Sequence, residues 1–104
     1  MKFPIPLPFT IYVTQSDINK GCQNHTKNCP TAHAINRRLP KGFFSFVWYD
    51  RIEIFTKDKH GDYKLTHEIK NPPRLNKWLK SYDKEKKVRP LRFPITINDI
   101  TRKP

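Results

Sequence analysis

The segment from Asn71 to Lys87, NPPRLNKWLKSYDKEKK, has the pattern of an amphipathic helix. Its apolar side chains recur at steps of three or four residues and form one stripe: Leu75, Trp78, Leu79 and Tyr82. Cations follow a similar spacing on the other side: Arg74, Lys77, Lys80, Lys84 and Lys87. Asn71 suits the N-cap, and Pro72-Pro73 suits the first turn. We expect this helix to cover a sheet with one face and to offer cations on the other.

The composition predicts one folded domain, residues 1–104, with a core rich in rings. Hydrophobic residues make up 36% of the chain, and there are seven Phe, four Tyr and two Trp. No apolar run approaches the roughly 20 residues of a membrane-spanning helix. The opening MKFPIPLPFTIYV is broken by prolines and lacks a small-residue cleavage site. We therefore expect an intracellular protein.

Period-two alternation predicts strands at 9–14, 43–49, 52–57, 63–69 and 91–98. Segment 43–49 is apolar on both faces, which is typical of a central strand. In segment 63–69 the inward set is Tyr63, Leu65, His67 and Ile69. Pro94 favours an edge strand, because it cannot donate to a neighbour. Gly61 suits the hairpin turn before Tyr63.

Two shorter helices are predicted in the first third of the chain. Thr14 and Asp17 form a capping box for one, and Gly21 would end it in the left-handed conformation. The other runs from Pro30 to Leu39, with proline at its first position. Residues 1–8 should form an extended arm, and residues 99–104 a frayed tail. The predicted fold class is α+β: a mostly antiparallel sheet of about five strands, with two main helices packed on one face.

Four side chains within twelve residues have the chemistry of zinc ligands: Cys22, His25, Cys29 and His33. A closed Cys2His2 set suits structural zinc, although the spacing is compressed and no CxxC pair is present. Two other interpretations are open. In the first, Cys29 is a buried residue at a helix start, and His25 and His33 are ordinary surface residues. In the second, Cys22 and Cys29 form a disulfide.

The sequence predicts a protein that is not an enzyme. It has three glycines, no GxGxxG or Walker loop, no HExxH and no paired carboxylates. A Cys–His nucleophile pair would lack a third group to orient it. We accordingly expect no cofactor other than the zinc considered above.

The charge points to an anionic partner. The chain has 21 Lys and Arg but only 9 Asp and Glu, which gives a formal net charge of +12. From Lys70 to Arg92 there are nine cations and two acids. The residues predicted to contact nucleic-acid phosphates are Lys70, Arg74, Lys77, Lys80, Lys84, Lys87, Arg89 and Arg92. The rings available to stack on bases are Tyr12, Tyr49 and Phe55.

The same cations allow other interpretations. They are a solvated helix face, or they dock on an acidic protein. Binding to a membrane surface is not expected, because the apolar stripe is narrow and is needed for the core. The edges at Phe9–Thr14 and Pro94 leave a monomer or an edge-strand dimer open.

One segment carries a recognisable pattern: Val13, Thr14, Asp17, Ile18, Gly21, Cys29, Pro30, Ala32, Ala34 and Ile35. In this pattern the chain resembles a group of small uncharacterised phage-encoded proteins. The resemblance implies a phage product that acts in the cytoplasm of a bacterial host, and it implies no established activity. Together with the charge, it leads us to expect a non-enzymatic phage protein that binds DNA or RNA through phosphates. The alternative is a protein that docks on and inhibits an acidic host protein.

Overall fold

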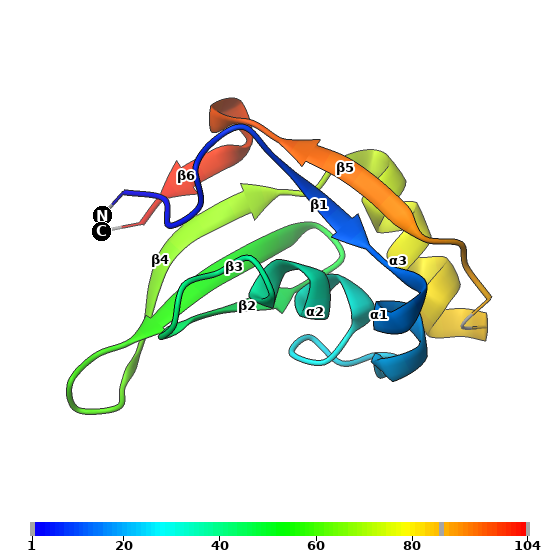
Figure 1. Ribbon diagram of the computed structural model, residues 1–104, viewed down its shortest axis with the longest axis horizontal. Coiled ribbons are helices and arrows are strands. Elements are labelled where there is room, and N and C mark those ends of the chain that lie inside the picture. The colour runs from blue at the N-terminus through cyan, green and yellow to red at the C-terminus, as the bar shows by residue number, and fades with distance from the viewer. Residues whose placement is uncertain (1, 86, 104) are drawn as a thin grey trace.

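Two antiparallel sheets and three α-helices are formed by residues 2–85 and 87–103, the part of the chain that the computed structural model describes (Figure 1). The strands are β1 (Phe9–Val13), β2 (Phe43–Val47), β3 (Arg51–Lys57), β4 (Tyr63–Lys70), β5 (Leu91–Ile95) and β6 (Ile100–Arg102). The helices are α1 (Gln15–Lys20), α2 (Pro30–Asn36), α3 (Pro73–Glu85) and the 3-10 turn η1 (Ile97–Asp99). The α+β class is confirmed.

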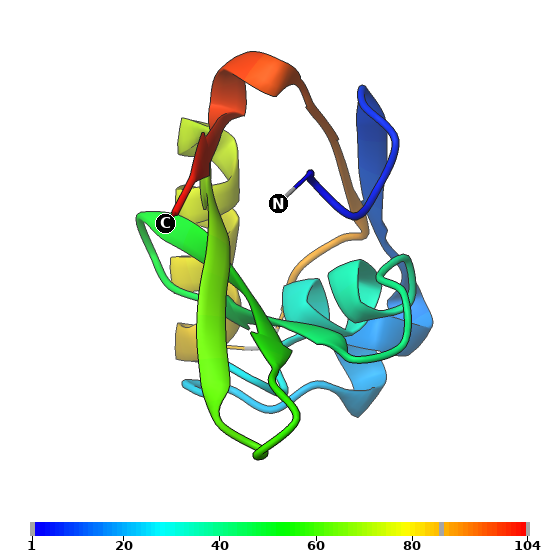
Figure 2. The ribbon, with the colours of Figure 1, turned by 90° about the vertical axis from the view of Figure 1, so that its left-hand side faces the viewer.

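The prediction of one sheet is wrong. β1 pairs with β5 in a two-stranded sheet, while the other four strands follow the order β2-β3-β4-β6. Figure 2 shows the two sheets on either side of the interior. The chain changes sheets after β5, because the Asp99 carboxylate accepts from the backbone N–H of Thr96 at 2.8 Å and turns the chain into η1. The predicted strand 91–98 is therefore cut short.

The helices do not line one face of a single sheet, because α2 packs against both β1 and β2. α3 buries Leu75, Leu79 and Tyr82 in the core, as its stripe predicted. The capping box of α1 is confirmed: the Thr14 side chain accepts from Asp17 N–H, and the Asp17 side chain accepts from Thr14 N–H. α2 begins at Pro30 as predicted but ends at Asn36, not Leu39.

Both ends of the described chain are docked. In the N-terminal arm Ile5 is buried, and the Phe3 ring contacts Phe9 and His67. The expectation of a frayed tail over 99–104 is wrong for residues 100–102, which pair with β4 as β6. Pro104 lies outside the described residues. The core joins side chains from both sheets, all three α-helices and the arm.

β2 is an edge strand, not the central strand that its two apolar faces predicted. Groups outside the strands occupy its free side: the N–H groups of Phe43, Ser45 and Val47 donate to Pro40 O, Asn36 Oδ1 and Thr26 O. Its outward face is apolar because it carries the half-buried rings of Phe44 and Phe46.

A bulge in β4 corrects the predicted inward set. Ile54 pairs with His67, but the next residue, Phe55, pairs with Leu65, so Thr66 is the extra residue. One extra residue exchanges the two faces of a strand. His67 and Ile69 therefore point inward as predicted, whereas Leu65 and its neighbour Tyr63 lie on the outer face with Phe55.

The free edges of the two-stranded sheet are capped by arginines. Arg38 and Arg37 donate to the carbonyls of Thr10 and Tyr12 on β1. On β5 the carbonyl of Arg92 accepts from Arg74. β5 is an edge strand, as Pro94 predicted. These side chains occupy carbonyls that an edge-to-edge dimer would use.

Gly21 is required by a close approach and not by a left-handed backbone, since its φ is −72°. A Cβ here would lie 2.6 Å from Pro30 Cδ and 2.7 Å from its backbone N. We expect Gly21→Ala to lower the free energy of unfolding by about 1–3 kcal/mol, because overpacking forces the backbone to shift. Urea denaturation measures this loss. Lys20→Ala, at an exposed neighbour, is the control and should stay within about 0.5 kcal/mol. Equal stability of Gly21→Ala and the wild type would contradict the close approach.

Candidate nucleic-acid interface

α3 starts where Pro72 turns the chain, since the Pro72 carbonyl accepts from the N–H groups of Leu75 and Asn76. The prediction that Asn71 caps the helix is wrong. Its side-chain Nδ2 instead donates to the carbonyl of Trp48 at 2.9 Å, and its Oδ1 accepts no hydrogen bond from the described residues. Asn71 thus ties the start of α3 to the end of β2.

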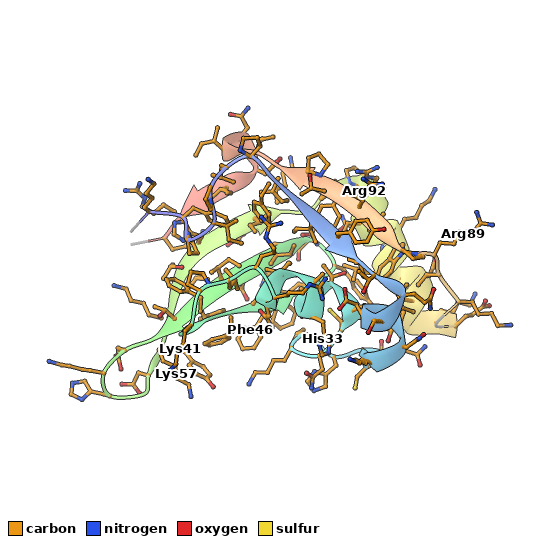
Figure 3. The ribbon with its side chains drawn as sticks, in the orientation of Figure 1. His33, Lys41, Phe46, Lys57, Arg89 and Arg92 are labelled. Carbon is orange, nitrogen blue, oxygen red and sulfur yellow. The ribbon has the colours of Figure 1, made fainter. Side chains whose placement is uncertain are left out.

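Two hydrogen bonds hold segment 87–92 against α3. The Trp78 indole Nε1 donates to the carbonyl of Arg89 at 2.8 Å, and Arg74 Nη2 donates to the carbonyl of Arg92 at 2.8 Å. Trp78 in turn stacks on Tyr82, with ring centroids 5.8 Å apart. Figure 3 shows Arg89 and Arg92 along this margin of the molecule. The cations of the segment and of the helix are thereby brought side by side.

These cations form a surface that we call the basic groove, made by Arg74, Lys77, Lys87 and Arg89. They line a hollow of about 320 Å³ together with Trp78, Ser81 and Val88. A second hollow of about 490 Å³ shares two of these cations and is lined by Pro73, Arg74, Asn76, Lys77 and Lys80. None of the described residues that line either hollow is acidic. The cations of the basic groove are exposed.

The other predicted cations are placed differently. Lys80 lines the second hollow, and its Nζ lies 6.0 Å from the Tyr49 ring. Arg92 is exposed on β5, and its carbonyl accepts a hydrogen bond from Arg74 of the groove. Lys70 and Lys84 are exposed but line neither hollow. The structure therefore gathers part of the predicted set and leaves these two apart.

Of the two acids within α3, Asp83 is bonded to residues outside the basic groove. Asp83 Oδ1 accepts from Asn24 N–H at 2.8 Å, and Oδ2 accepts from the Tyr49 hydroxyl. This hydrogen bond raises the pKa of Tyr49. Asp83 thus clamps the 22–29 loop and the β2–β3 connection to α3. Tyr49, predicted as a stacking ring, is 45% exposed and belongs to this clamp.

The remaining stacking candidates lie on different sheets. Tyr12 on β1 is 48% exposed, and Arg92 Cζ lies 5.3 Å from its ring centre. Phe55 on β3 belongs to a ring cluster on the outer face of the four-stranded sheet. Sequence reasoning missed the rest of that cluster, which comprises Phe44, Phe46 and Tyr63. The sequence signal for this cluster is the second apolar face of segment 43–49, which is typical of a central strand but here lies on the outside of the sheet.

The structure does not gather the predicted zinc ligands. Cys29 is buried as the N-cap of α2, where its Sγ accepts from Ala32 N–H. Cys22 is exposed, and the two cysteines are free. His25 Nδ1 accepts from Asn28 N–H at 3.1 Å. Across residues 2–85 and 87–103, no three His, Cys, Asp or Glu side chains are placed to hold a metal ion.

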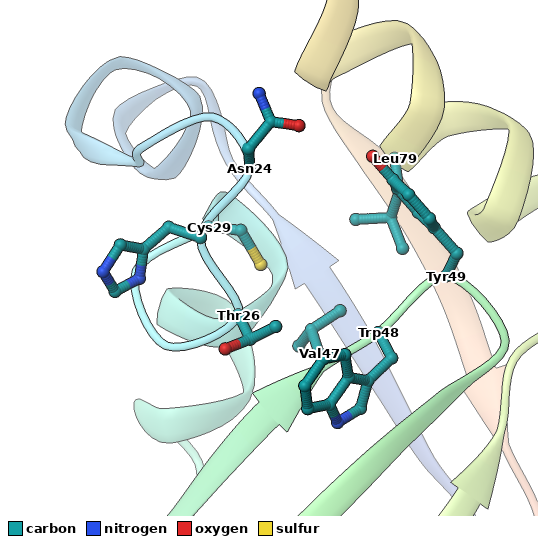
Figure 4. A pocket seen from close by; sticks show the side chains of 8 residues that line it. Asn24, Thr26, Cys29, Val47, Trp48, Tyr49 and Leu79 are labelled. Atoms are coloured by element: carbon teal, nitrogen blue, oxygen red, sulfur yellow. The ribbon is translucent and has the colours of Figure 1, made fainter.

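Cys29 also lines a mainly apolar hollow of about 230 Å³ between the 22–29 loop, β2 and α3 (Figure 4). Val47, Trp48 and Leu79 form much of its wall. Burial raises the pKa of the Cys29 thiol to about 11. At neutral pH the thiol is therefore protonated, and it forms part of an apolar wall and caps α2.

A scan of protein-family models found no match, and neither did searches of curated proteins and of solved structures. Within the described residues, no helix combines the length and the apolar character needed to cross a membrane. The interpretation of the basic groove therefore rests on its own geometry and charge.

Proposed function

We propose that this protein binds nucleic acid through phosphate contacts made at the basic groove. The observation that carries the proposal is the convergence of Arg74 and Lys77 from α3 with Lys87 and Arg89 from the next segment. Each cation that neutralises a phosphate releases condensed counterions, and this release drives binding. The net charge of +12 adds long-range attraction.

The docking of segment 87–92 distinguishes the groove from an ordinary solvated helix face. A helix alone presents one row of cations. Here the side chains of Trp78 and Arg74 donate hydrogen bonds to the carbonyls of Arg89 and Arg92. These bonds hold a second row of cations beside the row on the helix. Arg74 is then a structural clip, yet a guanidinium has five N–H donors, so others remain for a phosphate. We propose a non-enzymatic role, in line with the phage resemblance, in the cytoplasm of a bacterial host.

The test is fluorescence anisotropy with a labelled duplex and a labelled single strand between about 50 and 200 mM salt. The groove variant is Lys77→Gln/Lys87→Gln/Arg89→Gln. The control, Lys20→Gln/Lys59→Gln/Lys64→Gln, removes the same charge at exposed residues elsewhere. We expect the groove variant to lose at least about tenfold in affinity, with the log–log salt slope for duplex falling by about 0.9 per lost contact. The control should lose much less.

Equal losses in the two triple variants would show that only net charge matters and would reject the groove. Absence of micromolar binding by the wild type at the lowest salt would reject the function. The alternative partner, an acidic host protein, has its own signature: a partner captured from nuclease-treated lysate by the wild type and not by the groove variant. That result would assign the groove to protein docking.

A further inference from the structure

The outer face of the four-stranded sheet carries four rings in one connected cluster, which we call the aromatic face: Phe44, Phe46, Phe55 and Tyr63. The ring centroids of Phe44 and Tyr63 are 4.8 Å apart, and those of Phe46 and Phe55 are 4.9 Å apart. Phe44 lies parallel to Phe55 within 12°, at 5.8 Å. Tyr63 is 50% exposed, and the three Phe rings are half-buried.

Strand register builds this surface. Phe44 pairs directly with Phe55 across β2 and β3. The bulge at Thr66 then turns Tyr63 and Leu65 to the same side. Without the bulge these two residues would point into the core. α2 packs against β1 and β2, and α3 buries Leu75, Leu79 and Tyr82 in the core. The four rings stay outside that core and are exposed or only half-buried, so a ligand can reach them.

Two lysines accompany the rings. Lys27 Nζ lies 5.3 Å from the Phe46 centroid and 5.7 Å from that of Tyr63, and Lys57 Nζ lies 5.3 Å from Tyr63. The hydrogen bond from Val47 N–H to Thr26 O fixes the loop that carries Lys27. Both lysines also line a hollow of about 320 Å³ with Phe44 and Tyr63. Both are exposed.

We propose that the aromatic face binds unpaired bases of a single-stranded nucleic acid, with Lys27 and Lys57 contacting its phosphates. Bases stack on exposed rings whatever their sequence, and cations beside the rings follow the backbone. A duplex cannot offer its base faces to such a surface. The proposal rests on the proposed function for the class of partner, and it adds a second surface and a preference for single strands.

Charge complementarity favours this occupant over a second copy of the chain. In a two-fold interface the same patch meets itself, so the lysines of both copies would lie in one apolar contact. Glu53 is opposite the Phe46 ring on the neighbouring strand. Its carboxylate lies 3.6 Å from Arg51 Nε and accepts from the Trp48 indole, so it is already compensated. Figure 3 places Phe46 and Lys57 well apart from Arg89 and Arg92.

The experiment compares binding of labelled oligo(dT), oligo(U) and a duplex of equal length to Phe46→Ala and Tyr63→Ala. Each variant should lose about 5- to 150-fold in affinity for at least one of the two single strands, the loss expected for one stacked ring. Affinity for duplex should change less than about twofold. Tyr63→Phe keeps the ring and should bind as the wild type does. Ile97→Ala, at an apolar residue that is 68% exposed on η1, is the control for loss of surface. Melting curves confirm that each variant is folded.

Two outcomes would overturn the aromatic face: wild-type affinity of both alanine variants for single strands, or equal losses on duplex and single strands. Neither outcome affects the groove if the Lys77/Lys87/Arg89 variant still weakens duplex binding. Conversely, if the groove variant binds normally while the alanine variants lose single strands only, the groove fails and the aromatic face stands. Loss with oligo(dT) alone or with oligo(U) alone identifies which of these two strands the aromatic face binds.

Discussion

Replacing Tyr82 with alanine is expected to lower the free energy of unfolding by about 3–5 kcal/mol, the range for removing a large buried ring. Tyr82 is 0% exposed and stacks on Trp78 with an interplanar angle of 4°. Its hydroxyl donates to the carbonyl of Ile18 in α1 at 3.4 Å. The ring therefore fills the contact between α3 and α1.

Urea denaturation followed by tryptophan fluorescence measures this loss. Tyr82→Phe is the matched control, because it keeps the ring and removes only a long hydrogen bond, at a cost of about 1 kcal/mol. A loss in Tyr82→Ala no larger than in Tyr82→Phe would contradict the assignment of the ring to the core. Since Tyr82 supports Trp78, and Trp78 holds Arg89, a folded Tyr82→Ala should also bind nucleic acid more weakly.

Local spacing was sufficient to predict the features that depend on neighbours in sequence. The stripe of α3 and the capping box of α1 are examples, because residues three and four apart meet within one helix whatever surrounds it. The hairpin between β3 and β4 is another: Gly61 has a φ of +83°, as its turn required. In each case the side chains that decide the structure lie within a few residues of each other.

Features that depend on distant contacts were not predictable in this way. The ring content of β2 indicated burial on both faces, yet whether a helix covers a face is decided elsewhere in the chain. The bulge at Thr66 leaves no mark in the alternation of residues 63–69, although it moves Tyr63 and Leu65 from the inner face to the outer face. Gly21 ends α1 as predicted, but the need for glycine there comes from Pro30, nine positions away, and not from a left-handed backbone.

The candidate interface likewise combines features that local spacing predicts with features that depend on distant contacts. Helical spacing placed Arg74 and Lys77 on one face correctly. It could not show that Arg89 would join them, because that depends on a hydrogen bond from Trp78. It also could not separate Lys84 from the groove, since Lys84 follows Lys77 by about two helical turns and so shares its face of the helix. The cation Lys27 was missed altogether, because its loop reaches the aromatic face only through folding.

Asp17→Ala is the second substitution for which we expect a large loss, about 2–4 kcal/mol. The Asp17 carboxylate is buried and accepts from Arg37 Nη1 at 2.8 Å and Nη2 at 3.0 Å. It also accepts from the N–H of Thr14 as part of the capping box. Loss of a cap costs about 1 kcal/mol, and loss of charge-assisted bonds adds about 1.5–3. Solvent screens part of this, because the Arg37 side chain is 50% exposed.

The same contacts predict how stability depends on pH. Burial alone would raise the pKa of Asp17, but the hydrogen bonds from Arg37 and Thr14 outweigh it and hold the pKa below its usual value. A carboxyl whose pKa is lower in the folded state stabilises the fold fully above its unfolded pKa of about 3.9. That contribution is lost as the pH falls through the lower folded value. The free energy of unfolding should therefore decline below about pH 4.

Asp17→Asn isolates the charge, because the amide still offers an oxygen to Thr14 N–H but cannot ionise. We expect the stability difference between the wild type and Asp17→Asn to be constant near neutral pH and to shrink below about pH 4, in urea titrations from pH 7 to 2.5. Asp50→Asn removes the same charge from a carboxylate that also pairs with an arginine, Arg51, but whose side chain is 74% exposed. Its effect should stay within about 0.5 kcal/mol at every pH. Equal pH profiles for the two variants would mean that net charge, and not the pairing of the buried Asp17 carboxylate with Arg37, sets the acid sensitivity of the fold.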